Sequence, residues 1–158
     1  MKQLALLGGL TLALLFWPGH AHCQKVSKEK VFIGLPGKEL EAVLQEMKIA
    51  FKKDRGKKEG IYYYDFERGK LKLRVTNYND DDLWIDAIFP KLALKELNRW
   101  NQDAKFSRAV LFKDGDREST SLENQLDCRG GVTLGMVRQF IRRFEDEAKA
   151  FAKTLSKN

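Results

Sequence analysis

The chain has 158 residues and a formal net charge of +7, with 43% hydrophobic and 32% charged residues. This length and composition suit one folded domain with a substantial core, and nothing in them indicates a repeat or a long disordered segment. Two cysteines and two histidines occur, and three of these four, His20, His22 and Cys23, lie near the N-terminus. A histidine-based triad or a multi-histidine metal site therefore cannot be built in the rest of the chain. We expect no cofactor, no metal site and no enzymatic activity.

The N-terminal segment has the layout of a secretory signal peptide. Lys2 follows Met1, residues 4–17 are uncharged and almost all apolar, and Pro18-Gly19 ends the run. This run is shorter than the roughly 20 residues that a spanning helix needs. We expect a signal peptide over residues 1–23, cleaved after Ala21 or Cys23, and a bacterial protein that is periplasmic or secreted. Membrane attachment would require an uncleaved signal or a lipid on Cys23.

Residues 24–34 are largely polar and predict a tether, and residues 35–156 predict the single domain. At its start, Pro36 and Gly37 suit a helix N-terminus. Apolar residues then recur at helical spacing from Leu40 to Phe51, which predicts an amphipathic helix that reaches about residue 53.

Basic side chains are densest over residues 52–58, and three tyrosines follow at 62–64. A single-stranded nucleic acid site would combine such charges with stacking aromatic rings. Export argues against that interpretation, and tyrosines at strand spacing are typical of a core. We therefore expect no nucleic acid partner.

Alternating apolar residues and turn signals predict five strands. Their ranges are 61–67, 71–75, 83–89, 106–112 and 117–128. A short helix is expected over 91–103, and Thr133 is a good N-cap for a long last helix. The order α-β-β-β-α-β-β-α predicts an α+β fold with a five-stranded, mostly antiparallel sheet and the first and last helices packed on one face.

Two acidic turns raise the question of a cation site. The three consecutive aspartates at 80–82 suit either a cation or, more simply, a solvated turn. Asp114 and Asp116 begin like a calcium loop, which needs glycine at its sixth position and glutamate at its twelfth. Ser119 and Gln125 occupy those positions, which excludes that loop.

One enzymatic alternative uses carboxylates alone, as glycoside hydrolases do. Asp86 on the third predicted strand, with either Asp116 or Glu123, is the pair that the chain offers. Acid–base work needs both carboxylates in one cleft at a set separation. A carboxylate-based envelope hydrolase therefore depends on such a cleft.

Four short motifs mark the region after the third strand. They read LNRWN at 97–101, FSRA at 106–109, DGD at 114–116 and GGVT at 130–133. Together they resemble the YbjN-domain family, over roughly residues 35–155. The resemblance implies a fold similar to that of type III secretion chaperones and a role in bacterial sensory-transduction regulation. One departure is Ser107, where the family often has glycine.

Within these motifs, polar groups surround an aromatic anchor in a candidate binding patch of Asn98, Trp100, Asn101 and Arg108. Structural roles are the alternative: the asparagines cap the helix end or bond to backbone, Trp100 packs on the sheet edge, and Arg108 pairs with Asp103 or Asp116. We expect a protein-binding adaptor or regulator-like module with an unidentified protein partner. A structural homodimer is the other non-enzymatic alternative.

Overall fold

The computed structural model describes residues 29–155, which form an α+β fold with three helices and a six-stranded antiparallel sheet. The elements are β1 (Val31–Phe32), α1 (Gly37–Glu46), β2 (Phe51–Arg55), β3 (Ile61–Arg68), β4 (Leu71–Tyr78), β5 (Asp82–Pro90), α2 (Leu94–Asp103), β6 (Arg108–Asp114), β7 (Arg117–Asp127), β8 (Val132–Thr133) and α3 (Leu134–Leu155). The large sheet has the strand order β2-β3-β4-β5-β7-β6, and β1 pairs with β8 in a separate two-stranded sheet.

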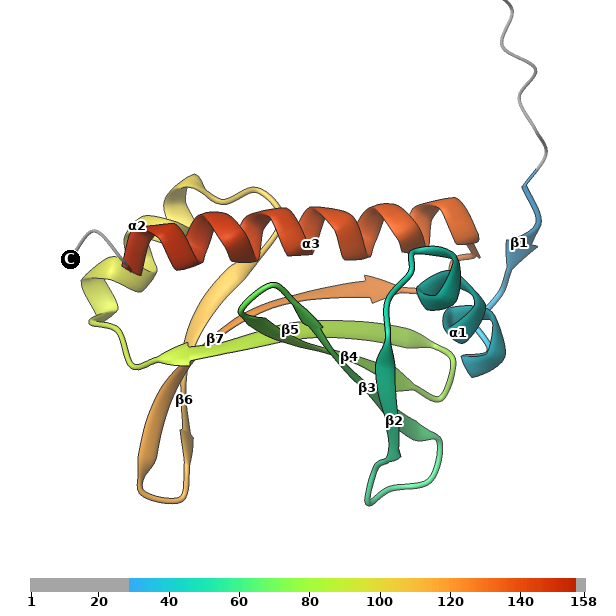
Figure 1. Cartoon of the computed structure of the whole chain (residues 1–158), viewed down its shortest axis with the longest axis horizontal. Helices are drawn as coiled ribbons and strands as arrows, with labels where there is room; N and C mark the ends of the chain where they lie inside the picture. Colours follow the sequence, from blue (N-terminus) through green and yellow to red (C-terminus); the bar gives the residue numbers. More distant parts are fainter. Residues whose placement is uncertain (1–28, 156–158) are drawn as a thin grey trace, which may run out of the picture.

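The core lies between α3 and one face of the large sheet. α3 runs across that face along its whole length, and α1 packs beside it near the β2 end (Figure 1). The buried apolar side chains of α3 recur every three or four residues, which is one face of a helix: Val137, Phe140, Ile141, Phe144, Ala148 and Phe151. The predicted covering of one face by the last helix is therefore seen directly.

The opposite face of the sheet is covered by no helix within residues 29–155. The β6–β7 hairpin and the β2–β3 connection both project away from α3, one at each end of this face (Figure 1). The uncovered face displays the alternate residues of each strand, including Trp84, Asp86 and Ile88 of β5.

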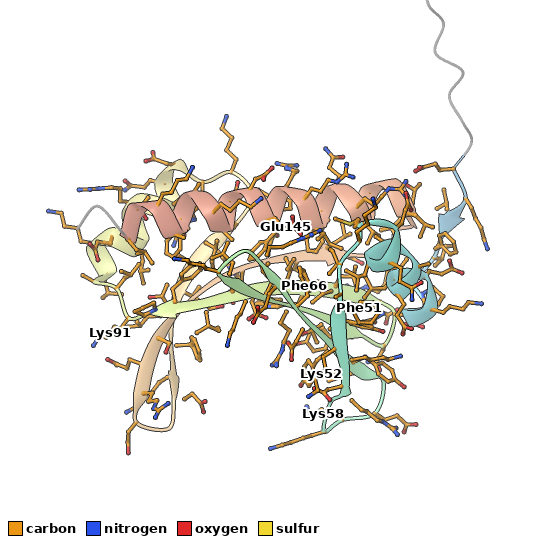
Figure 2. All side chains as sticks on the ribbon, in the orientation of Figure 1. Phe51, Lys52, Lys58, Phe66, Lys91 and Glu145 are labelled. Atoms are coloured by element: carbon orange, nitrogen blue, oxygen red, sulfur yellow. The ribbon has the colours of Figure 1, made fainter. Side chains whose placement is uncertain are left out.

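The prediction of five strands was wrong, because the first helix ends at Glu46 and the chain then forms β2. Lys48 has a positive φ of 55°, and its N–H donates to the carbonyl of Gln45 at 2.9 Å. This left-handed residue ends the helix as glycine commonly does. Phe51, which the helical pattern included, lies instead opposite Phe66 on β3; both are labelled in Figure 2. The ring centre of Phe51 lies 5.6 Å from that of Tyr64.

We expect Lys48→Gly to raise the free energy of unfolding by about 0.5–1 kcal/mol. Glycine adopts a positive φ without the steric cost that lysine carries there. The measurement is urea denaturation followed by far-UV circular dichroism. Lys38→Gly, in the first turn of α1, is the matched control and should lower stability slightly, because glycine gains nothing from a helical φ. Loss of stability in both variants would contradict the role assigned to Lys48.

The five predicted strands correspond to β3, β4, β5, β6 and β7, with small changes at their ends. Gly115 and Asp116 form the turn between β6 and β7, and Asp114 at the end of β6 pairs with Arg117. Thr133 caps α3, since its Oγ1 accepts a hydrogen bond from the N–H of Met136 at 3.2 Å.

The predicted signal peptide, including Cys23, lies outside the described residues. Of the predicted tether, residues 29–34 are described. Val31 pairs with Thr133 and Phe32 with Val132, which fastens this segment to the start of α3. Within the described range no helix is long and apolar enough to cross a membrane.

Candidate functional site

A row of charged residues crosses the uncovered face of the sheet from one edge to the other. The strand registers place one charged residue of every strand at the same level. In strand order this charged row consists of Lys52, Asp65, Arg74, Asp86, Glu123 and Arg108. Charges alternate along it except at the centre, where two carboxylates are neighbours.

Two arginines of the charged row are held by carboxylates next to them. Arg74 donates from Nε and Nη2 to the two oxygens of Asp65, at 2.6 and 2.9 Å. Arg108 donates from Nε to Oε1 of Glu123 at 2.9 Å, and its guanidinium carbon lies 5.5 Å from the ring centre of Trp84. The two hydrogen bonds to Asp65 fix the position of the Arg74 guanidinium group, whereas Arg108 makes one hydrogen bond to Glu123.

Asp86 stands between these two pairs and has no hydrogen bond or ion pair within residues 29–155. It is directly opposite Arg74 on one side and Glu123 on the other. Partial burial raises the pKa of Asp86 to about 6; Arg74 opposes this rise, while Glu123 and Asp65 add to it. The carboxylate is therefore ionised at neutral pH without a cation of its own.

A hollow of about 650 Å³ lies beside Asp86 on this face. We call it the sheet hollow. Its charged lining comprises Asp65, Glu67, Lys72, Arg74, Asp86 and Asp114. Ile88 and Phe112 supply apolar walls, and Ile88 is one of the most exposed large apolar side chains, at 53%. The hollow thus combines an excess of carboxylates with an apolar surface.

The predicted patch is divided by the fold. Asn101 and Arg108 both line a smaller pocket of about 340 Å³ at the β6 end of the charged row. Asn98 is exposed on another side of α2, and Trp100 packs on α3. A binding role for the patch stays a prediction, and only two of its four members share a pocket.

Asn101 binds the backbone of the edge strand β6. Its Nδ2 donates to the carbonyl of Ala109 at 2.9 Å, and its Oδ1 accepts from the N–H of Ala109 at 2.7 Å. The side chain thereby pairs with both polar groups of a buried residue, as another strand would. The backbone role considered for this asparagine is seen directly.

Trp100 packs on α3, and Arg108 has another partner than those expected. The ring of Trp100 lies 5.0 Å from that of Phe151 on α3. Arg108 pairs with Glu123, not with Asp103 or Asp116, because β6 and β7 place residues 108 and 123 opposite each other. The two-residue turn between β6 and β7 sets this register, so the pair follows from the hairpin.

The acidic turn at 80–82 serves the backbone. The carbonyl of Asp80 accepts from the N–H of Leu35 at 2.6 Å, and that of Asp81 accepts from the N–H of Cys128 at 2.7 Å. Within residues 29–155, no three His, Cys, Asp or Glu side chains are placed to hold a metal ion. The Cys128 thiol is buried, which raises its pKa to about 11 and leaves it protonated at neutral pH.

Asp86 and Glu123, one of the two carboxylate pairs considered from the sequence, are brought together on neighbouring strands. Asp116 lies away from them, in the turn between β6 and β7. Asp65, Arg74 and Ile88 were not singled out from the sequence. Strand alternation places them on one face, but only the register shows that they surround Asp86.

The YbjN family model, described as "Putative bacterial sensory transduction regulator", matches residues 36–157. Among solved structures, the chain is similar to the crystal structure of YbjN, "a putative transcription regulator from E. coli", with a TM-score of 0.62 and 13% sequence identity. The match covers 77% of this chain and 91% of that chain, and at this identity it shows the fold alone. A comparison with curated proteins found no match.

Proposed function

The chain belongs to the YbjN family, and on that premise we propose that it is a non-enzymatic, regulator-like module that binds a protein partner in the bacterial envelope. The observation that carries this proposal is the uncovered sheet face with its charged row and sheet hollow. No helix covers this face of the sheet, and paired charges surround an exposed apolar residue on it. Surfaces of this kind bind other proteins.

A binding role accounts for the held arginines better than catalysis does. Arg74 and Arg108 each have a carboxylate partner inside the protein. Glu123, which was considered with Asp86 for acid–base work, is thereby engaged with Arg108. Fixed charges favour orientation and selection of a partner, since electrostatic complementarity sets specificity and association rate.

Export is part of the proposal and rests on the N-terminal sequence. Mass spectrometry of the mature protein is the test. We expect the chain to begin at His22 or Gln24, after cleavage behind Ala21 or Cys23. A chain that retains Met1 would contradict export by a cleaved signal, and a lipid on the N-terminal residue Cys23 would place the protein on a membrane instead.

We expect Ile88→Arg to abolish capture of the partner. The full chain, with a C-terminal tag, is crosslinked in its native host, and captured proteins are identified by mass spectrometry. The control is Met136→Arg, because Met136 is also an exposed apolar residue, at 45%, but lies on α3. Proteins lost with Ile88→Arg and retained with Met136→Arg support the sheet face as the binding site.

The same set of proteins from both variants would contradict the proposal. Light scattering of the purified protein separates partner binding from self-association. A monomer mass at high concentration excludes a homodimer on the sheet face, and a dimer mass that Ile88→Arg converts to a monomer would replace the proposal with the homodimer.

A further inference from the structure

The sheet hollow is acidic although the chain as a whole is basic. Four carboxylates line it, from Asp65, Glu67, Asp86 and Asp114, against the two cations of Lys72 and Arg74. The whole chain carries a formal charge of +7. A local field of the opposite sign attracts a cationic group to this place on the surface.

Two cationic side chains line the hollow, Arg74 and Lys72, and neither forms an ion pair with Asp86 within residues 29–155. Arg74 is turned towards β3, where it holds both oxygens of Asp65 and lies 4.8 Å from the ring centre of Tyr63. Lys72 is opposite Glu67 on β3 and forms no ion pair within residues 29–155.

On the other side of Asp86, Arg108 is committed to Glu123. Asp86 is consequently the one member of the charged row for which, among the described residues, no hydrogen bond or ion pair is formed. A partly buried carboxylate in this condition is costly, and burial together with Glu123 and Asp65 raises its pKa to about 6 despite Arg74. A cation delivered from outside would remove that cost.

We propose that the sheet hollow receives a lysine or arginine side chain of a protein partner, whose cation pairs with Asp86 while its aliphatic stem lies against Ile88 and Phe112. Long basic side chains combine an apolar stem with a charged end, and this matches the two kinds of lining. The inference rests on the proposed function, because it names the partner chemistry of the same face.

The test uses acetylated, amidated pentalysine and pentaarginine as probes, with pentaglutamate as the control peptide. The carboxyl ¹³C resonances of the protein are followed by NMR near neutral pH. We expect the basic peptides to shift the resonance of Asp86 and to lower its pKa, while pentaglutamate leaves it unchanged. Affinity should fall as the pH is lowered through about 6, because protonation of Asp86 removes the charge that the peptide binds.

Two variants that remove the same charge distinguish binding at Asp86 from non-specific electrostatic attraction of the peptide to the protein. Asp86→Asn should weaken pentalysine binding by at least about fivefold, which corresponds to about 1 kcal/mol. Asp116→Asn removes the same charge outside the hollow and should change affinity by less than about twofold. Equal weakening in both variants, or an Asp86 resonance that the basic peptides do not move, would overturn the inference.

The crosslinking experiment distinguishes this inference from the proposed function. If Asp86→Asn retains the captured proteins that Ile88→Arg loses, the face binds a partner but the basic side chain in the hollow is wrong. If Ile88→Arg loses no captured protein, the proposed function itself fails.

Discussion

Asn101→Leu is expected to lower the free energy of unfolding by about 2–3 kcal/mol, although the side chain that it replaces is exposed. The substitution leaves the N–H and the carbonyl of Ala109 without their hydrogen bonds, and Ala109 is only 2% exposed. An unsatisfied buried backbone group costs about 1–3 kcal/mol. Urea denaturation measured by tryptophan fluorescence gives the change.

Asn98→Leu is the matched control, because it makes the same substitution on the same helix at an exposed asparagine whose side chain forms no hydrogen bond within residues 29–155. It should change stability by less than about 0.5 kcal/mol. Asn101→Asp is an intermediate variant, since a carboxylate still accepts from the N–H of Ala109 but cannot donate to its carbonyl. Equal effects of leucine at 98 and at 101 would contradict the role given to Asn101.

The two asparagines also show what the sequence could and could not tell. Both belong to the motif LNRWN, and the sequence predicts for both either binding of a partner, capping of the helix end or hydrogen bonds to backbone. Helical spacing places positions 98 and 101 about 60° apart, which does not decide which of them meets a strand. The answer depends on where α2 lies against β6, a tertiary contact that no local pattern specifies.

The strands were predictable because apolar residues alternate along them, and the last helix because its apolar stripe is long. The strand β2 could not be predicted, because Phe51 continues the apolar spacing of α1 and no glycine marks the end of that helix. The strand pairing that places Phe51 opposite Phe66 stabilises β2 more than the helical spacing of apolar residues stabilises a longer α1.

The charged row was partly within reach of the sequence. The connection between β3 and β4 has two residues, Gly69 and Lys70, and a hairpin this short fixes the register that places Asp65 opposite Arg74. The pairing of β5 with β7 is different, because α2 and β6 intervene in the chain. Asp86 beside Glu123 could be proposed as a pair, but its geometry required the fold.

The proposed binding surface has a cost in stability at Asp86. A carboxylate inside a protein is normally paired with a hydrogen-bond donor or a cation. The nearby carboxylates of Asp65 and Glu123 are each hydrogen-bonded to an arginine. The arginines closest to Asp86 in the charged row donate to these two carboxylates and not to Asp86. For stability alone a neutral residue at position 86 would be more favourable, and this cost is what pairing with a partner's cation would remove under the proposal.

We expect Asp86→Asn to raise the free energy of unfolding at neutral pH by about 1–2 kcal/mol. A pKa of about 6, above the ordinary 3.8, means that the folded protein holds a proton that the unfolded chain releases between these values. Wild-type stability from this group is therefore greatest below about pH 4, falls as the pH rises to about 6, and stays low above it. One pKa unit corresponds to about 1.4 kcal/mol, and contact of the carboxylate with solvent reduces the full amount. Urea denaturation between about pH 4 and pH 8 should show a gap between variant and wild type that widens with pH, and a gap independent of pH would contradict the burial of an unpaired charge.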